Sequence, residues 1–288
     1  MELLIATPPC QGFSTAGNQN ENDSRNFLTK EVVDIIRRYN EFKYIVIENV
    51  PGYLTDEIQI GNQKQTVISY LISELKSKYF IEYKILNASD YGCAQSRKRA
   101  IILMSHRPFA ELSFPTCCDQ IKLKDVIGHL PSLESGEKSN IPFHNALTHN
   151  DRHILWMRNT PTGKSAFENP KHFPQKENGE RIKAFPNTYK RMSWDKPAPT
   201  VTMNSGCLSS QNTVHPGRLQ KDGTYSDARV LTVKELMLIT GLDDKWKWGD
   251  TKDSIIRDVL GECVPPQLLF KITKSVKSHP SRIKTFFH

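Results

Sequence analysis

Hydrophobic positions in the first third of the chain alternate between two patterns. Short runs of consecutive apolar residues predict buried strands at residues 3–6, 44–47, 80–86 and 100–104. Between these runs, apolar residues recur three and four positions apart, which predicts helices over residues 27–39 and 66–78. Strands that alternate with helices predict an α/β fold built on a parallel, doubly wound sheet.

The pattern changes after residue 107. As far as residue 202 the chain is rich in Pro, Asn, His, Lys and Ser and shows little periodicity, which predicts loops such as residues 134–140 and 170–179. Regularity returns at residues 231–235, where Thr232 and Glu235 have the spacing of a capping box. Gly241 is expected to end that helix, and residues 266–288 contain one short helical pattern and a basic tail.

Composition narrows the possible roles of the protein. The 288 residues suit one large domain or two smaller ones, and 39 Lys and Arg against 31 Asp and Glu give a net charge of +8. That excess favours an anionic partner, of which nucleic acid is the commonest. No apolar run is long enough to span a bilayer, and the first residues lack the basic start of a signal peptide, so we expect a cytoplasmic protein.

The 6 cysteines predict neither a disulfide framework nor a metal site. None of them forms a C-x-x-C pair, and the grouping of Cys117 and Cys118 with His129 fits no common zinc spacing. We therefore expect ordinary thiols in a reducing compartment and no metal cofactor.

Three groups with chemical potential lie beside the predicted strands. Cys10 follows the first strand, Glu48 follows the second, and the segment from Gln95 to Arg99 precedes the fourth. In open α/β sheets, functional groups collect beyond the carboxyl ends of the strands, so a thiol, a carboxylate and guanidinium groups are candidates for one site. Nearby arginines lower the pKa of a thiol and make it nucleophilic. Each group also has an ordinary structural reading: a small buried hydrophobe, a helix cap and a solvated basic turn.

Several segments resemble the DNA cytosine-5-methyltransferase family. The sequence P-P-C-Q-G-F-S at residues 8–14 resembles its nucleophile motif, E-N-V at residues 48–50 its second catalytic motif, and residues 95–99 its Q-x-R-x-R motif. Residues 189–200 and 229–235 resemble the segments that follow the family's recognition region, and G-E-C-V-P-P at residues 261–266 resembles its closing G-N-x-V-P-P motif. The resemblance therefore covers nearly the whole chain, with the motifs in the family's order.

The resemblance implies a fold. It is a Rossmann-like, S-adenosylmethionine-dependent methyltransferase sheet with a smaller, irregular target-recognition domain. The implied division is a catalytic domain at residues 1–125, a target-recognition domain at 126–249, and a C-terminal segment at 250–288 that returns to the catalytic domain. Basic side chains that lie among aromatic residues in the recognition region would contact double-stranded DNA.

The resemblance also implies a mechanism. A cytosine flipped out of the duplex would be attacked at ring carbon C6 by Cys10. Glu48 would hold ring N3 and the exocyclic amine. Arg99, with Arg97 beside it, would bind ring O2 and a nearby phosphate and stabilise the developing negative charge. S-adenosylmethionine would supply the methyl group. The implied cofactor-binding residues are Pro9, Leu28, Cys263 and Val264, and the implied DNA-binding residues are Gln11, Ser14, Gln95 and Arg191.

Two departures from the family change these expectations. The glycine-rich cofactor loop, D-L-F-x-G-x-G-G in type, does not precede the nucleophile motif, which implies an N-terminally incomplete sheet with an exposed edge at residues 3–6. A second polypeptide would then supply the missing strands, with a truncated gene or a misplaced start codon as the alternative. Glu262 stands where the family usually has Asn, and a carboxylate there either repels the carboxylate of the cofactor or rearranges when the partner is present.

Three functional classes follow from these observations. The first is an active DNA methyltransferase of a restriction-modification system. The second is a catalytically inactive homologue that binds DNA or regulates another enzyme, and the third is a relative that methylates RNA. The complete set of Cys10, Glu48, Arg97 and Arg99 favours the active enzyme, because an inactive copy has no need of all four.

Overall fold

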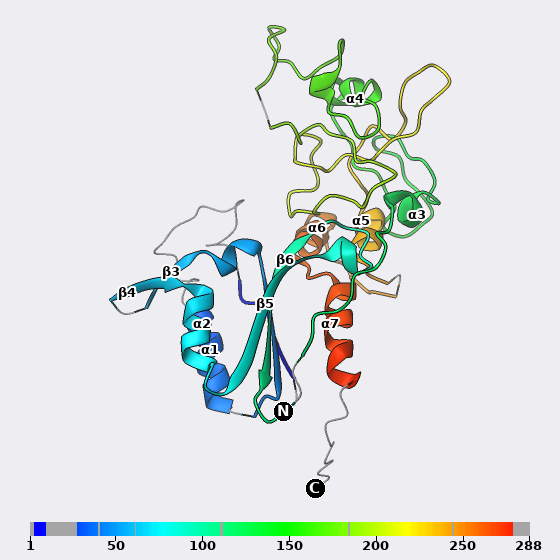
Figure 1. Ribbon diagram of the computed structural model, residues 1–288. Coiled ribbons are helices and arrows are strands. Elements are labelled where there is room, and N and C mark those ends of the chain that lie inside the picture. Colours follow the sequence, from blue (N-terminus) through cyan, green and yellow to red (C-terminus); the bar gives the residue numbers. More distant parts are fainter. Residues whose placement is uncertain are drawn as a thin grey trace. The chain divides into compact units, whose positions relative to one another are not determined.

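The chain folds as two compact units (Figure 1). The computed structural model describes residues 3–9, 28–39, 41–60, 62–109, 112–183, 185–243 and 245–278. Unit 1 contains Met1–Asn87, Lys98–Cys117 and Leu269–His288, and unit 2 contains Ala88–Arg97 and Cys118–Leu268. This division differs from the predicted boundaries at residues 125 and 249, since unit 2 also includes residues 88–97 and extends to Leu268.

Unit 1 is built on a sheet of four strands in the order β1-β2-β6-β5. The strands are β1 (Leu3–Ala6), β2 (Tyr44–Asn49), β5 (Tyr79–Asn87) and β6 (Lys98–His106), so all four predicted strands are confirmed. β1 runs parallel to β2, but β6 runs antiparallel to both β2 and β5. The prediction of a parallel sheet is therefore wrong, and the sheet is mixed. Parallel neighbours need a long crossover, whereas β5 and β6 are joined by residues 88–97 alone.

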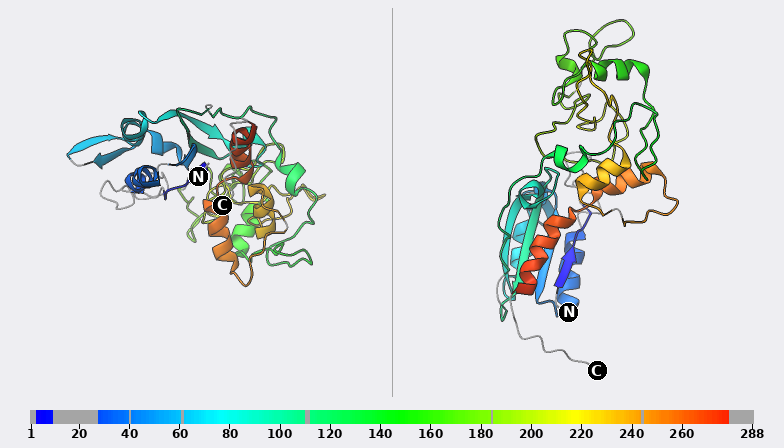
Figure 2. Two further views of the ribbon diagram at one scale, coloured as in Figure 1. Left: turned by 90° about the horizontal axis from the view of Figure 1, so that it is seen from below. Right: turned by 90° about the vertical axis from the view of Figure 1, so that its right-hand side faces the viewer.

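Helices cover both faces of this sheet. α1 (Leu28–Tyr39) and α2 (Val67–Leu75) lie on one face, and residues 269–278 of α7 (Pro266–Ser278) lie on the other (Figures 1 and 2). The predicted helices are thus confirmed, and Thr66 caps α2 by accepting a hydrogen bond from the backbone N–H of Ser69 at 3.2 Å. Every residue of β2 is buried, which explains why its sequence is an unbroken apolar run rather than an alternating one.

β1 lies at the edge of the sheet. Within the described ranges its strand partner is β2, and its outer side has no further strand. Ile5 is 43% exposed there, although β-branched residues of central strands are normally buried. The edge expected at residues 3–6 is therefore present in the structure.

A small hairpin in unit 1 was not predicted. It consists of β3 (Glu57–Ile60) and β4 (Gln63–Thr66), which pair antiparallel. The signal is present in the sequence, because Ile58 and Ile60 alternate with polar residues and Ile58 is buried.

Unit 2 is largely irregular, as its composition predicts. It contains the short helices α3 (Leu123–Ile127), α4 (Asp151–Arg158), α5 (Val233–Thr240) and α6 (Asp253–Glu262). One hydrophobic cluster joins α3, α5 and α6, and a second surrounds Trp156, Tyr189 and Val214. The capping box at Thr232 and Glu235 is confirmed, and Gly241 ends α5 with a φ of 82°. Among the described segments, no helix combines the length and apolarity needed to cross a lipid bilayer.

A buried ionic cluster ties the irregular segments of unit 2 together. Arg229 contacts Asp227 at 2.9 Å and Glu235 at 2.8 Å, and all three side chains are inaccessible to solvent or nearly so. Burial alone would raise the pKa of Glu235, but Arg229 and His215 outweigh it and hold that pKa at about 2. The R-x-L-T-x-x-E pattern at residues 229–235 therefore has a structural explanation, since its Arg and Glu form this pair.

Candidate functional site

Glu48 and Arg99 form an ion pair at one end of the sheet in unit 1. Because β6 runs antiparallel to β2, its first residues lie beside the last residues of β2, and Asn49 is in register with Ala100. The Nε atom of Arg99 lies 2.9 Å from Oε1 of Glu48, and the two side chains are only 13% and 7% exposed. The structure thus brings together two of the predicted catalytic residues, which are far apart in sequence.

The Asn of the E-N-V motif holds the segment that leads to Cys10. Asn49 is buried, and its Nδ2 donates a hydrogen bond to the carbonyl oxygen of Pro8 at 3.0 Å. Its Oδ1 accepts a hydrogen bond from the backbone N–H of Val50 at 2.9 Å, which fixes the orientation of the amide. The end of β2 therefore positions both the carboxylate of Glu48 and the chain two residues before Cys10. Cys10 itself, with Gln11 and Ser14, lies outside the described residues.

The Q-x-R-x-R motif is divided between the two units. Arg99 belongs to unit 1, whereas Gln95 and Arg97 belong to unit 2 and are 1% and 3% exposed. Gln95 Oε1 accepts a hydrogen bond from the backbone N–H of Val201 at 3.1 Å. Arg97 donates from Nη1 to the carbonyl of Val201 at 2.9 Å and from Nη2 to the carbonyl of Gly261 at 2.8 Å. Both side chains therefore bond to the protein's own backbone, and the predicted DNA contact of Gln95 and the predicted charge stabilisation by Arg97 stay predictions.

Arg191 also occupies a structural position. It is 1% exposed, and its guanidinium donates to backbone carbonyls, among them those of Met157 and His215 at 2.9 Å. Burial lowers its pKa to about 10. The donors of its guanidinium are directed at the protein's own backbone, and the predicted contact between Arg191 and DNA stays a prediction.

The predicted cofactor-binding residues fall in both units. Pro9 and Leu28 belong to unit 1, where Leu28 begins α1. Cys263 and Val264 belong to unit 2, where Cys263 follows the last residue of α6 and its Sγ donates to the carbonyl of Val264 at 3.2 Å. Leu28 and Val264 are half-buried apolar side chains of the kind that line a cofactor pocket. No glycine-rich loop follows a strand in the described ranges.

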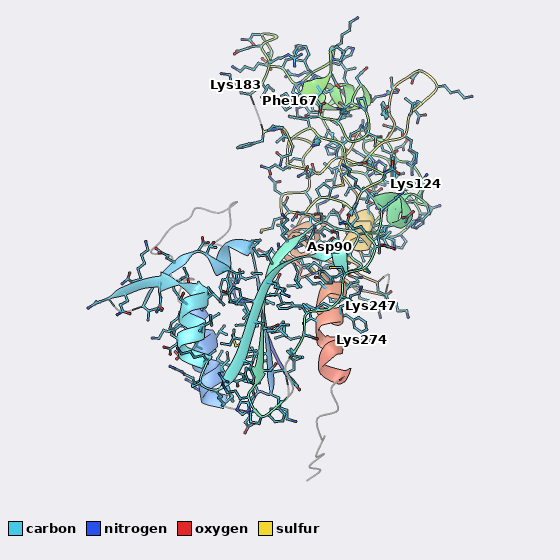
Figure 3. All side chains as sticks on the ribbon, viewed as in Figure 1. Asp90, Lys124, Phe167, Lys183, Lys247 and Lys274 are labelled. Carbon is cyan, nitrogen blue, oxygen red and sulfur yellow. The ribbon has the colours of Figure 1, made fainter. Side chains whose placement is uncertain are left out.

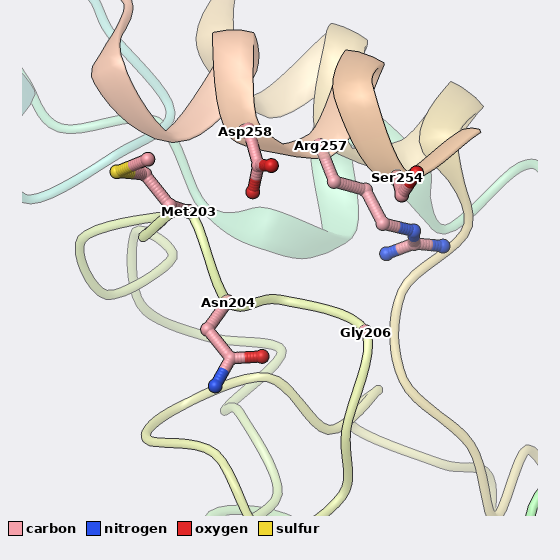
Figure 4. A pocket seen from close by; sticks show the side chains of 6 residues that line it. All are labelled: Met203, Asn204, Gly206, Ser254, Arg257 and Asp258. Atoms are coloured by element: carbon pink, nitrogen blue, oxygen red, sulfur yellow. The ribbon is translucent and has the colours of Figure 1, made fainter. Parts of the chain in front are cut away.

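Unit 2 contains a cavity between α6 and the segment from Met203 to Gly206 (Figure 4). Its volume is about 390 Å³, and it is lined by Met203, Asn204, Gly206, Ser254, Arg257 and Asp258. Arg257 is buried and donates to the carbonyls of Ser205 at 3.2 Å and Leu231 at 2.9 Å. Sequence reasoning did not identify this cavity, because its lining residues come from segments about fifty positions apart.

Exposed basic side chains occur on the surface of unit 2. Lys124 and Lys183 both extend from that surface (Figure 3). Arg181 is exposed as well, and its guanidinium stacks on the ring of Phe173 at 3.6 Å from the centroid. Side chains of this kind are suited to phosphate contacts, which depend on charge and reach rather than on burial.

Comparison with known proteins gives the same assignment along the whole chain. The model of the C-5 cytosine-specific DNA methylase family matches residues 1–278. The chain is 45% identical over 282 residues to the Type II methyltransferase M1.HgaI of Avibacterium volantium, covering 96% of this chain and 78% of that protein. It is 30% identical over 281 residues to the Type II methyltransferase M1.HphI of Haemophilus parahaemolyticus, covering 96% of this chain and 68% of that protein.

Solved structures agree at the level of the fold. The Entamoeba histolytica methyltransferase EhMeth superimposes with a TM-score of 0.59 at 16% identity, over 95% of this chain and 76% of that chain. A mutant of Spodoptera frugiperda DNMT2 gives a TM-score of 0.59 at 14% identity, over 96% of this chain and 79% of that chain. The family match, the two relatives and the pairing of Glu48 with Arg99 lead to one conclusion: the chain belongs to the C-5 cytosine-specific DNA methylase family and is a DNA (cytosine-5-)-methyltransferase.

Proposed function

We propose that the protein methylates C5 of a flipped cytosine in a specific duplex sequence through a covalent adduct with Cys10. The ion pair of Glu48 and Arg99 at the end of β2 carries this proposal. It places an acceptor and several donors side by side, which matches the alternating donors and acceptors on the Watson–Crick edge of cytosine. Asn49 supports the proposal, because it fixes Pro8 beside the same strand end.

Each residue has a defined task in the reaction. The Cys10 thiolate forms a bond to C6, and the electron pair of the C5–C6 double bond moves toward C5 and the N3 side of the ring. Glu48 holds N3 and the exocyclic amine and favours protonation at N3 as the ring gains electrons. Arg99 donates to O2 and stabilises the charge that develops there. S-adenosylmethionine, when bound, would supply a methyl group activated by its sulfonium, and C5 would take that group as its bond to sulfur breaks. Loss of the C5 proton to a base then restores the double bond and expels Cys10.

Trapping of the adduct tests this proposal. Duplex DNA that contains 5-fluorocytosine has no C5 proton to lose, so the Cys10 adduct should persist and shift the protein in a denaturing gel. The wild-type chain, supplied with S-adenosylmethionine and any partner segment, should form the adduct, and Cys10→Ser should not. DNA binding without an adduct would favour a binding or regulatory homologue instead, and adduct formation on tRNA alone would favour an RNA substrate.

The two relatives suggest a biological setting. Both M1.HgaI and M1.HphI are Type II methyltransferases, so we propose that this chain also modifies DNA within a restriction-modification system. The substrate would be cellular double-stranded DNA, which places the reaction in the cytoplasm. The net charge of +8 and exposed side chains such as Lys124 and Lys183 support binding to a polyanion.

A further polypeptide segment is proposed to complete the cofactor site. The open edge of β1 supports this, since an exposed apolar strand edge is a template for another strand. Equilibrium dialysis with labelled S-adenosylmethionine should show weak binding by this chain and tighter binding once the product of a neighbouring reading frame is added. Tight binding by the chain alone would contradict this part of the proposal.

A further inference from the structure

We propose that Arg97 is a positioning residue for target recognition: it fixes an exposed turn at residues 202–204 from a position two residues before the catalytic Arg99. This inference rests on the proposed DNA-methylating function and assigns Arg97 a role different from binding the base. Three observations carry it: the contacts of Arg97, the packing of Gly261, and the exposure of the turn.

The contacts of Arg97 belong to a set that attaches residues 94–97 to residues 198–201. The backbone N–H of Ser96 donates to the carbonyl of Ala198 at 2.7 Å, and that of Ala198 donates to Ala94 at 2.8 Å. Thr200 Oγ1 donates to the carbonyl of Ser96 at 2.8 Å. Arg97 adds a hydrogen bond to the carbonyl of Val201. Val201 is the last residue of this bonded segment before the turn. The buried Arg–carbonyl bond is charge-assisted and is therefore stronger than a neutral one.

Gly261 links the same guanidinium to the other side of the turn. A Cβ atom at Gly261 would lie 2.3 Å from the backbone nitrogen of Met203 and 2.5 Å from the carbonyl carbon of Thr202. The last turn of α6 therefore packs directly against the backbone at residues 202–203, with no room for a side chain. Arg97 Nη2 donates to the Gly261 carbonyl and so holds the helix end that supports the turn. One planar fork thus fixes both the start of the turn and its support.

The turn itself is available for contact with a ligand. Thr202, Met203 and Asn204 are exposed, and the side chain of Asn204 makes no hydrogen bond within the described part of the chain. Its amide offers both a donor and an acceptor, a combination that recognises base edges in DNA. Arg97 is two residues from Arg99, a span of at most about 7 Å. A base edge of a bound duplex can pair with such an amide, so the position in which Arg97 holds this turn bears on recognition.

Loss of the fork should affect recognition more than chemistry. Arg99 and Glu48 lie in unit 1 and keep their own ion pair when Arg97 is replaced. The turn would lose the contact at Val201 and the support at Gly261. A displaced turn discriminates less between flanking bases, so methylation of near-cognate sites should rise relative to methylation of the cognate site. Lys cannot bond both carbonyls with a planar fork, so Arg97→Lys should give an intermediate result.

Bisulfite sequencing of plasmid DNA from an expressing bacterial host tests this inference. The readout is the ratio of methylation at the cognate sequence to methylation at sites with one mismatch, with expression adjusted to equal cognate methylation. For Arg97→Met we expect this ratio to fall roughly tenfold, which corresponds to partial loss of one base-pair discrimination. Gly261→Ala should lower the ratio similarly, because its methyl group displaces the same backbone.

A matched control is available in the same segment. Gly206→Ala also adds one methyl group, but its nearest neighbour would be 3.7 Å away, so its ratio should equal that of the wild type. If the Arg97→Met protein does not accumulate in the host, Thr200→Val takes its place. Thr200→Val removes the hydrogen bond from Thr200 to the carbonyl of Ser96, and together with Gly261→Ala it tests whether the position of the turn controls the methylation ratio. A ratio unchanged in these variants overturns the inference. Absence of any methylation by the wild-type protein would instead overturn the proposed function.

Discussion

At the scale of single residues, the proposed chemistry depends on the pairing of Glu48 with Arg99. Both side chains are nearly buried, and their ion pair compensates the charge of each. The carboxylate is held in place before any substrate arrives. Such preorganisation is the main source of catalytic advantage in polar sites, because no reorientation is needed during the reaction.

Replacement of this carboxylate should stop the reaction without unfolding the protein. Glu48→Gln keeps the shape of the side chain but removes its negative charge, so we expect the methylation rate to fall by roughly 10²–10⁴-fold. The measurement is the rate of methyl transfer to duplex DNA, with thermal unfolding as a check on folding. Glu57→Gln is the control, since Glu57 forms an exposed ion pair with Lys64 at 3.4 Å and its loss should leave the rate unchanged. A Glu48→Gln protein as active as the wild type would exclude the assigned role.

At this scale, sequence motifs select candidate residues but do not say where each side chain points. The motifs led to Glu48 and Arg99, and the structure brings them together. Arg97, Gln95 and Arg191 were assigned to substrates, yet their side chains bond to the protein's own backbone. A guanidinium suits a phosphate and a backbone carbonyl equally well, and only the tertiary fold decides which is within reach.

Buried histidines should make the stability of unit 2 sensitive to mild acid. Burial lowers the pKa of His215 to about 3 and that of His149 to about 4, from a usual value of 6.5. The folded protein therefore stays unprotonated at these sites while the unfolded chain takes up protons, so stability is full above pH 6.5 and falls as the pH drops toward 4. Urea unfolding at pH 7 and pH 5 measures the difference.

A substitution at His215 identifies the source of this dependence. His215→Gln should reduce the fall in unfolding free energy between pH 7 and pH 5, because the amide does not titrate. His129→Gln, at an exposed position, should leave the dependence as in the wild type. The interpretation fails if both variants show the wild-type dependence.

At the scale of secondary-structure elements, local patterns located the strands and helices but not their directions. The runs at residues 80–86 and 100–104 are strands, and the Thr232 capping box begins α5. The antiparallel direction of β6 was missed because apolar runs carry no sign of direction. The short helices α4 and α6 were missed because propensity is weak over so few turns and packing stabilises them.

The cap of α5 should stabilise the folded protein more than an ordinary helix cap does. Thr232 Oγ1 accepts from the backbone N–H of Glu235 at 3.2 Å and also lies 3.0 Å from Nδ1 of buried His144. Thr232→Ala should cost about 2 kcal/mol, the upper end of the range for caps, since it also leaves His144 without that partner. Thr232→Ser keeps the hydroxyl and should cost less. Urea denaturation at neutral pH measures both, and equal losses would show that the hydroxyl is not responsible.

At the scale of the whole molecule, charge and the irregular unit 2 point to a partner larger than a small molecule. The net charge of +8 is distributed over a chain whose basic residues are largely exposed, as Lys124 and Lys183 illustrate. The sequence predicted the irregular character of this region from its composition. It did not predict that residues 88–97 belong to it, because only the fold shows which distant segments pack together.

DNA affinity should decrease steeply with ionic strength. Basic side chains release counterions from the phosphates they neutralise, so between about 50 and 200 mM salt we expect the affinity to fall by at least roughly tenfold. Fluorescence anisotropy with a labelled duplex gives the dissociation constant at each salt concentration. Affinity that is constant across this range would show that these side chains do not contact phosphates.

The interleaving of the two units has a consequence for how specificity can be exchanged between related enzymes. The chain passes between them after Asn87, Arg97, Cys117 and Leu268, so unit 2, which contains the predicted recognition region, is not one continuous segment. A chimaera that takes only residues 118–268 from a relative would keep this protein's Gln95 and Arg97 against a foreign partner segment. Transplantation should therefore succeed more often when residues 88–97 travel with the recognition region as a second, coupled insert.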